Sequence, residues 1–176
     1  MGKNGVDLWH YALGDDFSPV VTPCENDKPK SIGRSVTGRK DYCNNNDVWK
    51  EFLNISEEIC SVLHKKNLYA AGVQVHIRTS SLSVKEFSLT YPDMINSSLI
   101  FAKRGFDLFL RNYTFGEPLR SVGLRAINLK LPDETAVQQD IFGLSEEIQE
   151  IEKVENSVFE LRQKFGNDSI KRGTTI

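Results

Sequence analysis

Residues 71–79 alternate strictly between apolar and polar side chains, which is the pattern of a β-strand with one buried face. Residues 82–91 also alternate, from Glu86 to Tyr91, and residues 119–129 do so from Ser121 to Ala126. The short link at Ser80–Ser81 predicts that the first two strands form a hairpin. A further strand is predicted from about Lys30 to Gly38. Because every predicted strand has one apolar and one polar face, the sheet they form must be covered on one side and open on the other.

Two helices are predicted between these strands. Residues 44–47 form a polar cluster typical of a helix N-terminus, and an apolar stripe continues from there to about Lys66. A second helix, from about Asn96 to Asn112, has the strongest helical periodicity in the chain, with apolar residues alternately three and four positions apart. The order β-α-β-β-α-β predicts an α+β fold, in which a four-stranded sheet carries both helices on its apolar face.

The first predicted strand has a polar face on which every side chain is small and most carry a hydroxyl group. Its residues are Ser31, Gly33, Ser35 and Thr37. Positive charge surrounds this face at Arg34, Arg39 and Lys40. Small side chains let a polyanionic backbone come close, while hydroxyls, strand-end amides and arginines supply donors and charge. The stretch predicts phosphate contact, although by itself an exposed basic strand without a ligand explains it equally well.

The last predicted strand repeats this composition. Its polar face presents Ser121, Gly123 and Arg125. A merely solvated face has no reason to lack long acidic side chains on two strands at once, and Glu86 is the one acid expected on the open face. The repetition therefore favours a face that binds a polyanion.

Charge is distributed unevenly along the 176 residues, although the formal net charge is only −2. Residues 28–40 carry five basic and no acidic side chains, whereas residues 133–160 carry nine acidic side chains against Lys153 alone. The three cysteines and three histidines are widely spaced, which argues against a disulfide framework or a metal site. No apolar run is long enough for a transmembrane helix or a signal peptide, so a cytoplasmic protein without membrane contact is expected.

The segments Lys30–Thr37 and Arg120–Arg125, with the two helices, resemble the opening and closing strands of the little finger domain of Y-family translesion DNA polymerases. Residues 5–14 resemble the end of the thumb domain of that family, with a short helix closed by Gly14. The resemblance divides the chain into the end of a thumb domain at 1–14, a linker at 15–29, a little finger domain at 30–131 and a tail at 132–176.

The resemblance implies that the little finger domain lies along the primer-template duplex and grips phosphates through its outer strands. Binding should then be largely independent of sequence and sensitive to salt. The catalytic palm, with its Mg²⁺, would lie in the remainder of the polymerase, so no catalytic residue, cofactor or metal is expected here and this chain alone is not expected to be an enzyme. The implied DNA contacts are Ser31, Gly33, Arg34, Ser35, Thr37, Arg78, Arg120, Ser121, Gly123 and Arg125.

A second short motif lies beyond the predicted domain. The segment Gln138–Phe142 resembles the peptide with which bacterial proteins bind the sliding clamp, although Gln139 stands where leucine is usual. In this linear-peptide mode, a glutamine bonds at the rim of the clamp and apolar anchors fill a pocket. The expected clamp contacts are Gln138, Asp140, Ile141 and Phe142. The alternative is that Phe142 packs locally.

The acidic segment Ser145–Phe165 is predicted to be an amphipathic helix that docks on the domain or on another part of the polymerase, or forms a short coiled coil. Two other functions remain open for the β-α-β-β-α-β unit. One is a ferredoxin-like domain that binds a small molecule or regulates another protein. The other is an RNA-recognition domain, which needs exposed aromatic residues on its central strands, whereas Phe87 and Tyr91 are expected on the core side.

Overall fold

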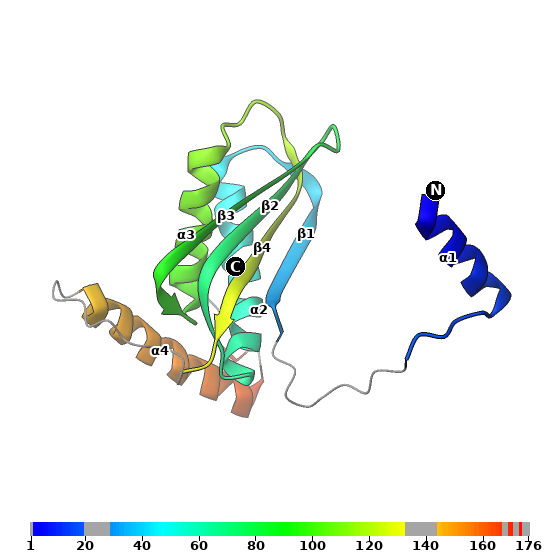
Figure 1. Ribbon diagram of the computed structural model, residues 1–176. Helices are drawn as coiled ribbons and strands as arrows, with labels where there is room; N and C mark the ends of the chain where they lie inside the picture. The colour runs from blue at the N-terminus through cyan, green and yellow to red at the C-terminus, as the bar shows by residue number, and fades with distance from the viewer. Residues whose placement is uncertain (1, 20–28, 133–143, 167–168, 171–172, 174–176) are drawn as a thin grey trace.

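The computed structural model describes residues 2–19, 29–132, 144–166, 169–170 and 173. Its central unit is an α+β domain in which a four-stranded sheet carries two helices on one face (Figure 1). The predicted fold class is confirmed. In chain order the elements are α1 (Gly2–Leu13), β1 (Ser31–Tyr42), α2 (Asn45–Lys65), β2 (Tyr69–Thr79), β3 (Val84–Ile95), α3 (Ser98–Asn112), β4 (Leu119–Lys130) and α4 (Leu144–Phe165).

The order of the strands in the sheet differs from their order in the sequence. The sheet runs β1-β4-β2-β3, and each neighbouring pair is antiparallel. The predicted hairpin is present as β2 and β3. The last strand, β4, is not an outer strand of the sheet, because it lies between β1 and β2 and joins them.

Two strands are longer than the alternation predicts. β1 continues to Tyr42, but its register on β4 shifts between Thr37 and Tyr42, so its end is irregular. β3 continues past Pro92 to Ile95, which lies opposite Ala70. A proline is tolerated there because β3 is an edge strand, where an outward-facing backbone nitrogen has no partner strand.

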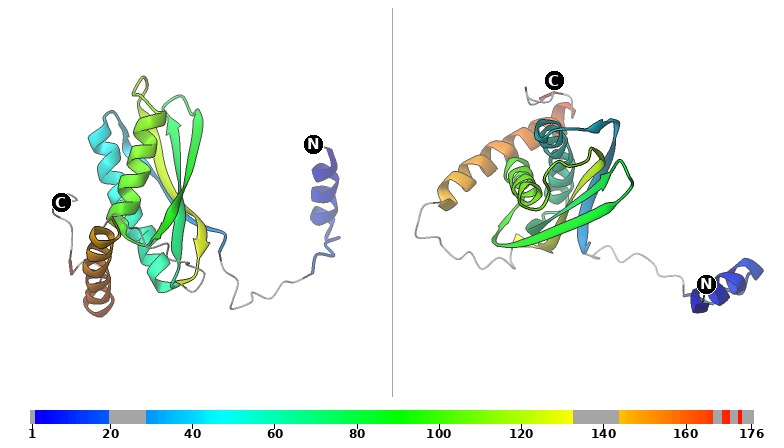
Figure 2. Two further views of the ribbon diagram at one scale, coloured as in Figure 1. Left: turned by 60° about the vertical axis from the view of Figure 1, so that its left-hand side comes forward. Right: turned by 90° about the horizontal axis from the view of Figure 1, so that it is seen from above.

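The hydrophobic core lies between the sheet and the two helices. β2 and β4 contribute their apolar residues, among them Val75 and Leu124, and the helices contribute phenylalanines such as Phe52 and Phe109. The rings of Phe52 and Phe109 meet edge to face with centroids 6.1 Å apart. This packing fixes the helices on one side and leaves the opposite side of the sheet uncovered (Figure 2).

Both central helices begin at a capping residue. The Asn44 side chain accepts a hydrogen bond from the Asp47 backbone N–H at 2.9 Å, as the polar cluster predicted. Ser97 caps α3 and accepts from the Ile100 N–H at 3.4 Å, so this helix begins at Ser98 and not at Asn96.

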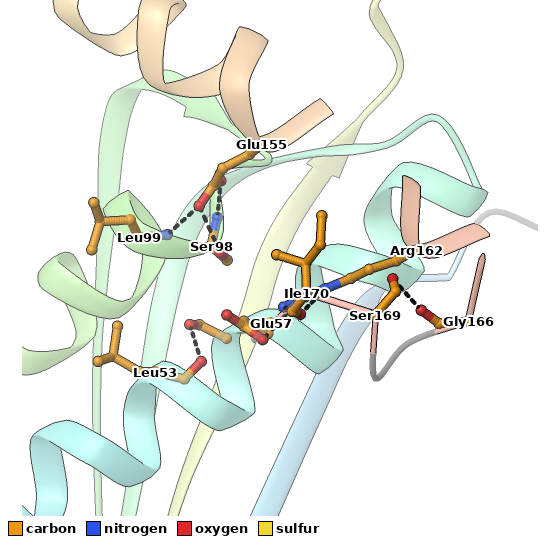
Figure 3. Close-up of polar contacts among 10 residues, drawn as sticks. Leu53, Glu57, Ser98, Leu99, Glu155, Arg162, Gly166, Ser169 and Ile170 are labelled. Atoms are coloured by element: carbon orange, nitrogen blue, oxygen red, sulfur yellow. Dashed lines mark hydrogen bonds and ion pairs between the residues drawn. The ribbon is translucent and has the colours of Figure 1, made fainter. Parts of the chain in front are cut away.

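The acidic helix α4 lies against α2 and α3, on the side away from the sheet (Figures 1 and 2). Its Glu155 carboxylate accepts hydrogen bonds from the Ser98 N–H at 2.7 Å and the Leu99 N–H at 3.2 Å, at the N-terminus of α3 (Figure 3). Burial raises the pKa of Glu155, but the hydrogen bonds from Ser98, Ser97 and the Leu99 backbone outweigh it and hold the pKa below its ordinary value. The carboxylate thus supplies the negative charge that a helix N-terminus favours.

Two more contacts hold α4 in place. The Phe159 ring stacks on His64 of α2 at 4.9 Å between centroids. The Arg162 guanidinium lies 3.2 Å from a Glu57 carboxylate oxygen and also donates to the Ile170 backbone carbonyl (Figure 3). In the structure the acidic helix therefore docks on the domain, which was one of the alternatives for it.

Candidate nucleic-acid interface

The open face of the sheet is built from every second residue of each strand. The pairings of β1 with β4, β4 with β2, and β2 with β3 align these residues in rows that cross the sheet. In the order β1, β4, β2, β3 the rows are Thr37, Ser121, Arg78, Val84; then Ser35, Gly123, His76, Glu86; then Gly33, Arg125, Gln74, Ser88; and then Ser31, Ile127, Gly72, Thr90.

This register brings most of the sequence-predicted contacts together on one surface. The β1 residues Ser31, Gly33, Ser35 and Thr37 are exposed. Beside them, Ser121 and Gly123 of β4 are buried between their neighbours, so the surface has a low floor along β4 and hydroxyl groups along β1. At Ser35, Thr37, Ser121 and Gly123 no bulky side chain stands in the way, so a backbone of linked phosphates can approach the surface closely there.

Two glycines make the close pairing of β1 and β4 possible. A Cβ atom at Gly123 would lie 2.8 Å from the Ser35 Cβ and 2.9 Å from the Arg34 backbone oxygen. A Cβ atom at Gly33 would lie 3.0 Å from the Arg125 Cβ and Cγ. Gly33 therefore leaves room for the stem of Arg125, which crosses toward β1 over it.

Two arginines provide positive charge on this face. Arg125 is exposed, and no described carboxylate forms an ion pair with it. Arg78 is half-buried, and its Nε is buried with no hydrogen-bond partner among the described residues. The half-buried guanidinium of Arg78 therefore adds positive charge to this face, while its Nε is covered by neighbouring atoms.

Arg34 and Arg120 do not join this group. Arg34 alternates to the helix side of β1, where its Nε lies 2.9 Å from a carboxylate oxygen of Glu58 on α2. The Arg120 guanidinium donates to the Gly38 carbonyl at 3.0 Å and lies 3.3 Å from the Asp41 carboxylate. Arg120 thus stabilises the irregular end of β1. This role depends on the register shift, which alternation along the sequence does not indicate.

The β3 side of the open face is occupied by an internal polar network. One oxygen of the Glu86 carboxylate lies 3.1 Å from His76 Nδ1, and the other accepts a hydrogen bond from Gln74 Nε2 at 3.1 Å. Sequence alternation places these side chains on the open face, but only the cross-strand register shows that they meet. Lys85 lies on the other side of β3, with its ammonium 5.6 Å from the centre of the Tyr113 ring.

Phe87 and Tyr91 are partly buried and pack against the core, as expected. The open face therefore does not take from them the exposed aromatic rings that an RNA-recognition domain uses for base stacking.

The predicted clamp contacts Gln138, Asp140, Ile141 and Phe142 lie outside the described residues. In the described part of the chain, no group of three or more histidine, cysteine or acidic side chains is arranged to hold a metal ion. Within the same residues, no helix has both the length and the apolar character needed to cross a membrane.

The chain is similar to proteins of one known family. Residues 29–141 match the C-terminal domain of the impB/mucB/samB family. The chain is 31% identical over 179 residues to DNA polymerase IV of Acetivibrio thermocellus, with 100% of this chain and 44% of that protein covered. It is 27% identical over 182 residues to DNA polymerase IV of Alkaliphilus oremlandii, with 100% and 45% covered. The chain thus spans less than half the length of the curated relatives it matches.

Two solved structures are also similar to this chain. One is a Y-family DNA polymerase chimera, with 17% identity, a TM-score of 0.48, and 74% of this chain and 36% of that one covered. The other is a complex of a beta-clamp processivity factor and the little finger domain of PolIV, with 17% identity, a TM-score of 0.47, and 65% and 99% covered. The family match to residues 29–141 covers more than half of the chain. The chain therefore belongs to the impB/mucB/samB family and contains its C-terminal domain.

Proposed function

We propose that this chain is the DNA-binding little finger region of a translesion DNA polymerase and that the open face of the sheet grips the backbone of the primer-template. The observation that carries the proposal is the alignment of small, hydroxyl-bearing and arginine side chains on β1, β4 and β2. The relatives named DNA polymerase IV support the same assignment. Nucleotide addition, with its Mg²⁺, would belong to the rest of the polymerase.

The proposed contacts divide the work by chemistry. The hydroxyls of Ser31, Ser35 and Thr37 donate hydrogen bonds to phosphate oxygens, and the glycines allow the backbone to come close. Arg125 and Arg78 supply positive charge. None of these groups has to read a base edge, so the grip does not depend on sequence or on an undamaged base. This property suits a polymerase that copies damaged templates.

The test is the affinity of the full chain for a short fluorescent duplex, measured by anisotropy at several salt concentrations. In a plot of the logarithm of the binding constant against the logarithm of the salt concentration, each phosphate contact makes the slope more negative by about 0.9. Arg125→Ala should therefore weaken binding and make the slope less negative by about 0.9, the value of one contact. Arg111→Ala is the matched control, because Arg111 is an exposed arginine on α3, which packs on the covered side of the sheet. Binding that ignores salt and Arg125→Ala alike would overturn the proposal.

We also propose that residues 138–142 bind the bacterial sliding clamp, with Ile141 and Phe142 as buried anchors and Gln138 and Asp140 at the rim. The support is the motif and its place directly after the domain. A pull-down with purified clamp should lose its signal on Phe142→Ala and keep it on Phe165→Ala, which removes an exposed phenylalanine from the end of α4. An unchanged signal for Phe142→Ala would contradict the proposed binding of residues 138–142 to the clamp.

A further inference from the structure

The open face carries one acidic side chain among its paired positions in the described strands, and that side chain is already engaged. Glu86 lies on β3, directly opposite His76 of β2. Its carboxylate meets His76 Nδ1 with one oxygen and the Gln74 amide with the other, both at 3.1 Å. A single anion therefore bridges two neighbouring positions of β2 that face the same way.

The position of this bridge divides the open face into two parts. β3 forms one edge of the sheet and β1 forms the other, with β4 beside β1. On the β1 and β4 side, the surface offers hydroxyls, glycines and Arg125, which forms no ion pair with a carboxylate of the described residues. On the β3 side, Gln74 Nε2 and His76 Nδ1 are engaged by a carboxylate, so these two atoms are less available to a ligand.

We infer that Glu86 is an internal anion that sets the limit of the DNA track, because it occupies Gln74 and His76 and repels phosphate from β3. The inference rests on the proposed function, since it assumes that the open face binds a polyanion. The DNA backbone then follows β1, β4 and Arg78. Glu86 is in this sense a positioning residue: it touches no phosphate, and it acts through the two side chains that it holds and through the repulsion between its charge and phosphate.

The carboxylate is well placed for both effects. Its oxygens occupy Gln74 Nε2 and His76 Nδ1, so a phosphate can bond to these two atoms only in competition with Glu86. The Glu86 carboxylate and a phosphate group also repel each other, because both carry negative charge. Because about half of the Glu86 side chain is exposed, salt screens this repulsion, and its effect is greatest at low ionic strength.

The experiment uses the full chain and a short fluorescent duplex DNA. Glu86→Gln keeps the size of the side chain and one accepting oxygen, but removes the charge. We expect Glu86→Gln to tighten binding about threefold at low ionic strength and to have little effect at high salt. Asp107→Asn is the matched control, because it removes the same charge from an exposed position on α3. Thermal unfolding of each variant checks that the fold is intact.

A second background tests whether Glu86 acts through its partners. When Gln74 and His76 are both replaced by alanine, the gain from Glu86→Gln should shrink clearly, as expected for residues that act together. A gain of the same size in both backgrounds would overturn the action through Gln74 and His76. No gain, or an equal gain from Asp107→Asn, would overturn the role of Glu86 altogether.

These outcomes are separate from failure of DNA binding itself. If Arg125→Ala weakens binding while Glu86→Gln changes nothing, the open face still binds DNA and only the limit at β3 is wrong. If neither variant changes binding, the proposed function fails together with the inference.

Discussion

Strand β4 contributes Val122, Leu124 and Ala126 to the helix side of the sheet, where all three are buried in the core. From its other side, the same strand offers Ser121, Gly123 and Arg125. The helix side is fixed by many apolar contacts, each of which needs a particular volume. The open side has few internal contacts, so its composition is free to serve a ligand. The difference predicts that substitutions on the two sides will affect different properties.

The largest effect is expected from Phe109→Ala on the covered side. Phe109 is fully buried, and the centroid of its ring lies 5.5 Å from that of Tyr113 and 6.1 Å from that of Phe52. Removing it leaves a cavity and should lower the free energy of unfolding by about 3–5 kcal/mol. Ser88→Ala, on the exposed face of β3, should change it by less than about 0.5 kcal/mol. Urea denaturation of both variants measures the two free energies of unfolding. Equal losses of stability would contradict the expected difference between the two sides of the sheet.

A smaller effect is expected where α4 caps α3. Glu155→Gln removes the charge and leaves one accepting oxygen where two now serve the Ser98 and Leu99 N–H groups, and should cost about 1–2 kcal/mol. Glu160→Gln, at an exposed position of the same helix, should cost almost nothing. Urea denaturation at neutral pH measures both.

The same carboxylate gives this contact a pH dependence with a definite sign. The pKa of Glu155 in the folded chain lies below its ordinary value of 4.5, so its contribution to stability is complete above that pH and is lost as the pH falls through the folded pKa. The difference in stability between the unaltered chain and Glu155→Gln should therefore narrow in acid. A difference that stays constant down to low pH would show that the charge of Glu155 is not what matters.

The smallest effect distinguishes the two sides of β1. Arg34 forms an ion pair with Glu58 in which both side chains are mostly exposed, so Arg34→Ala should cost at most about 0.5 kcal/mol of stability. If the open face alone carries the grip, Arg34→Ala should also weaken DNA binding severalfold less than Arg125→Ala. Anisotropy titrations at one low salt concentration are sufficient. An equal loss would extend the contact surface around the edge of β1.

Much of this architecture follows from residue periodicity. The alternation in residues 71–79 predicted the core side chains of β2, because it reflects burial directly. The apolar stripe of α3 predicted Ala102 and Phe109 in the core but missed Phe101 and Leu108, which are also buried. The shared Ser, Gly and Arg composition predicted that β1 and β4 present one surface, and the register confirms that they lie side by side.

Other parts of the site depend on information that no local pattern contains. The partner of Arg34 comes from α2, and the partners of Arg120 depend on a register shift after Thr37. The bridge from Glu86 to Gln74 and His76 depends on which residues face each other across two strands. Pairings of this kind are set by tertiary packing, so the sequence names the residues without saying which of them meet.

The strand order has a consequence for how the domain is made. Within the described sheet, β1 pairs with β4 alone, although β1 is the first strand and β4 the last to be synthesised. While the ribosome is producing α2, the β2–β3 hairpin and α3, the strand that bears Ser31 to Thr37 has no neighbour to pair with. Such distant pairing slows folding, because a long loop must close before the contact forms. The proposed phosphate-binding surface is therefore incomplete until β4 enters between β1 and β2.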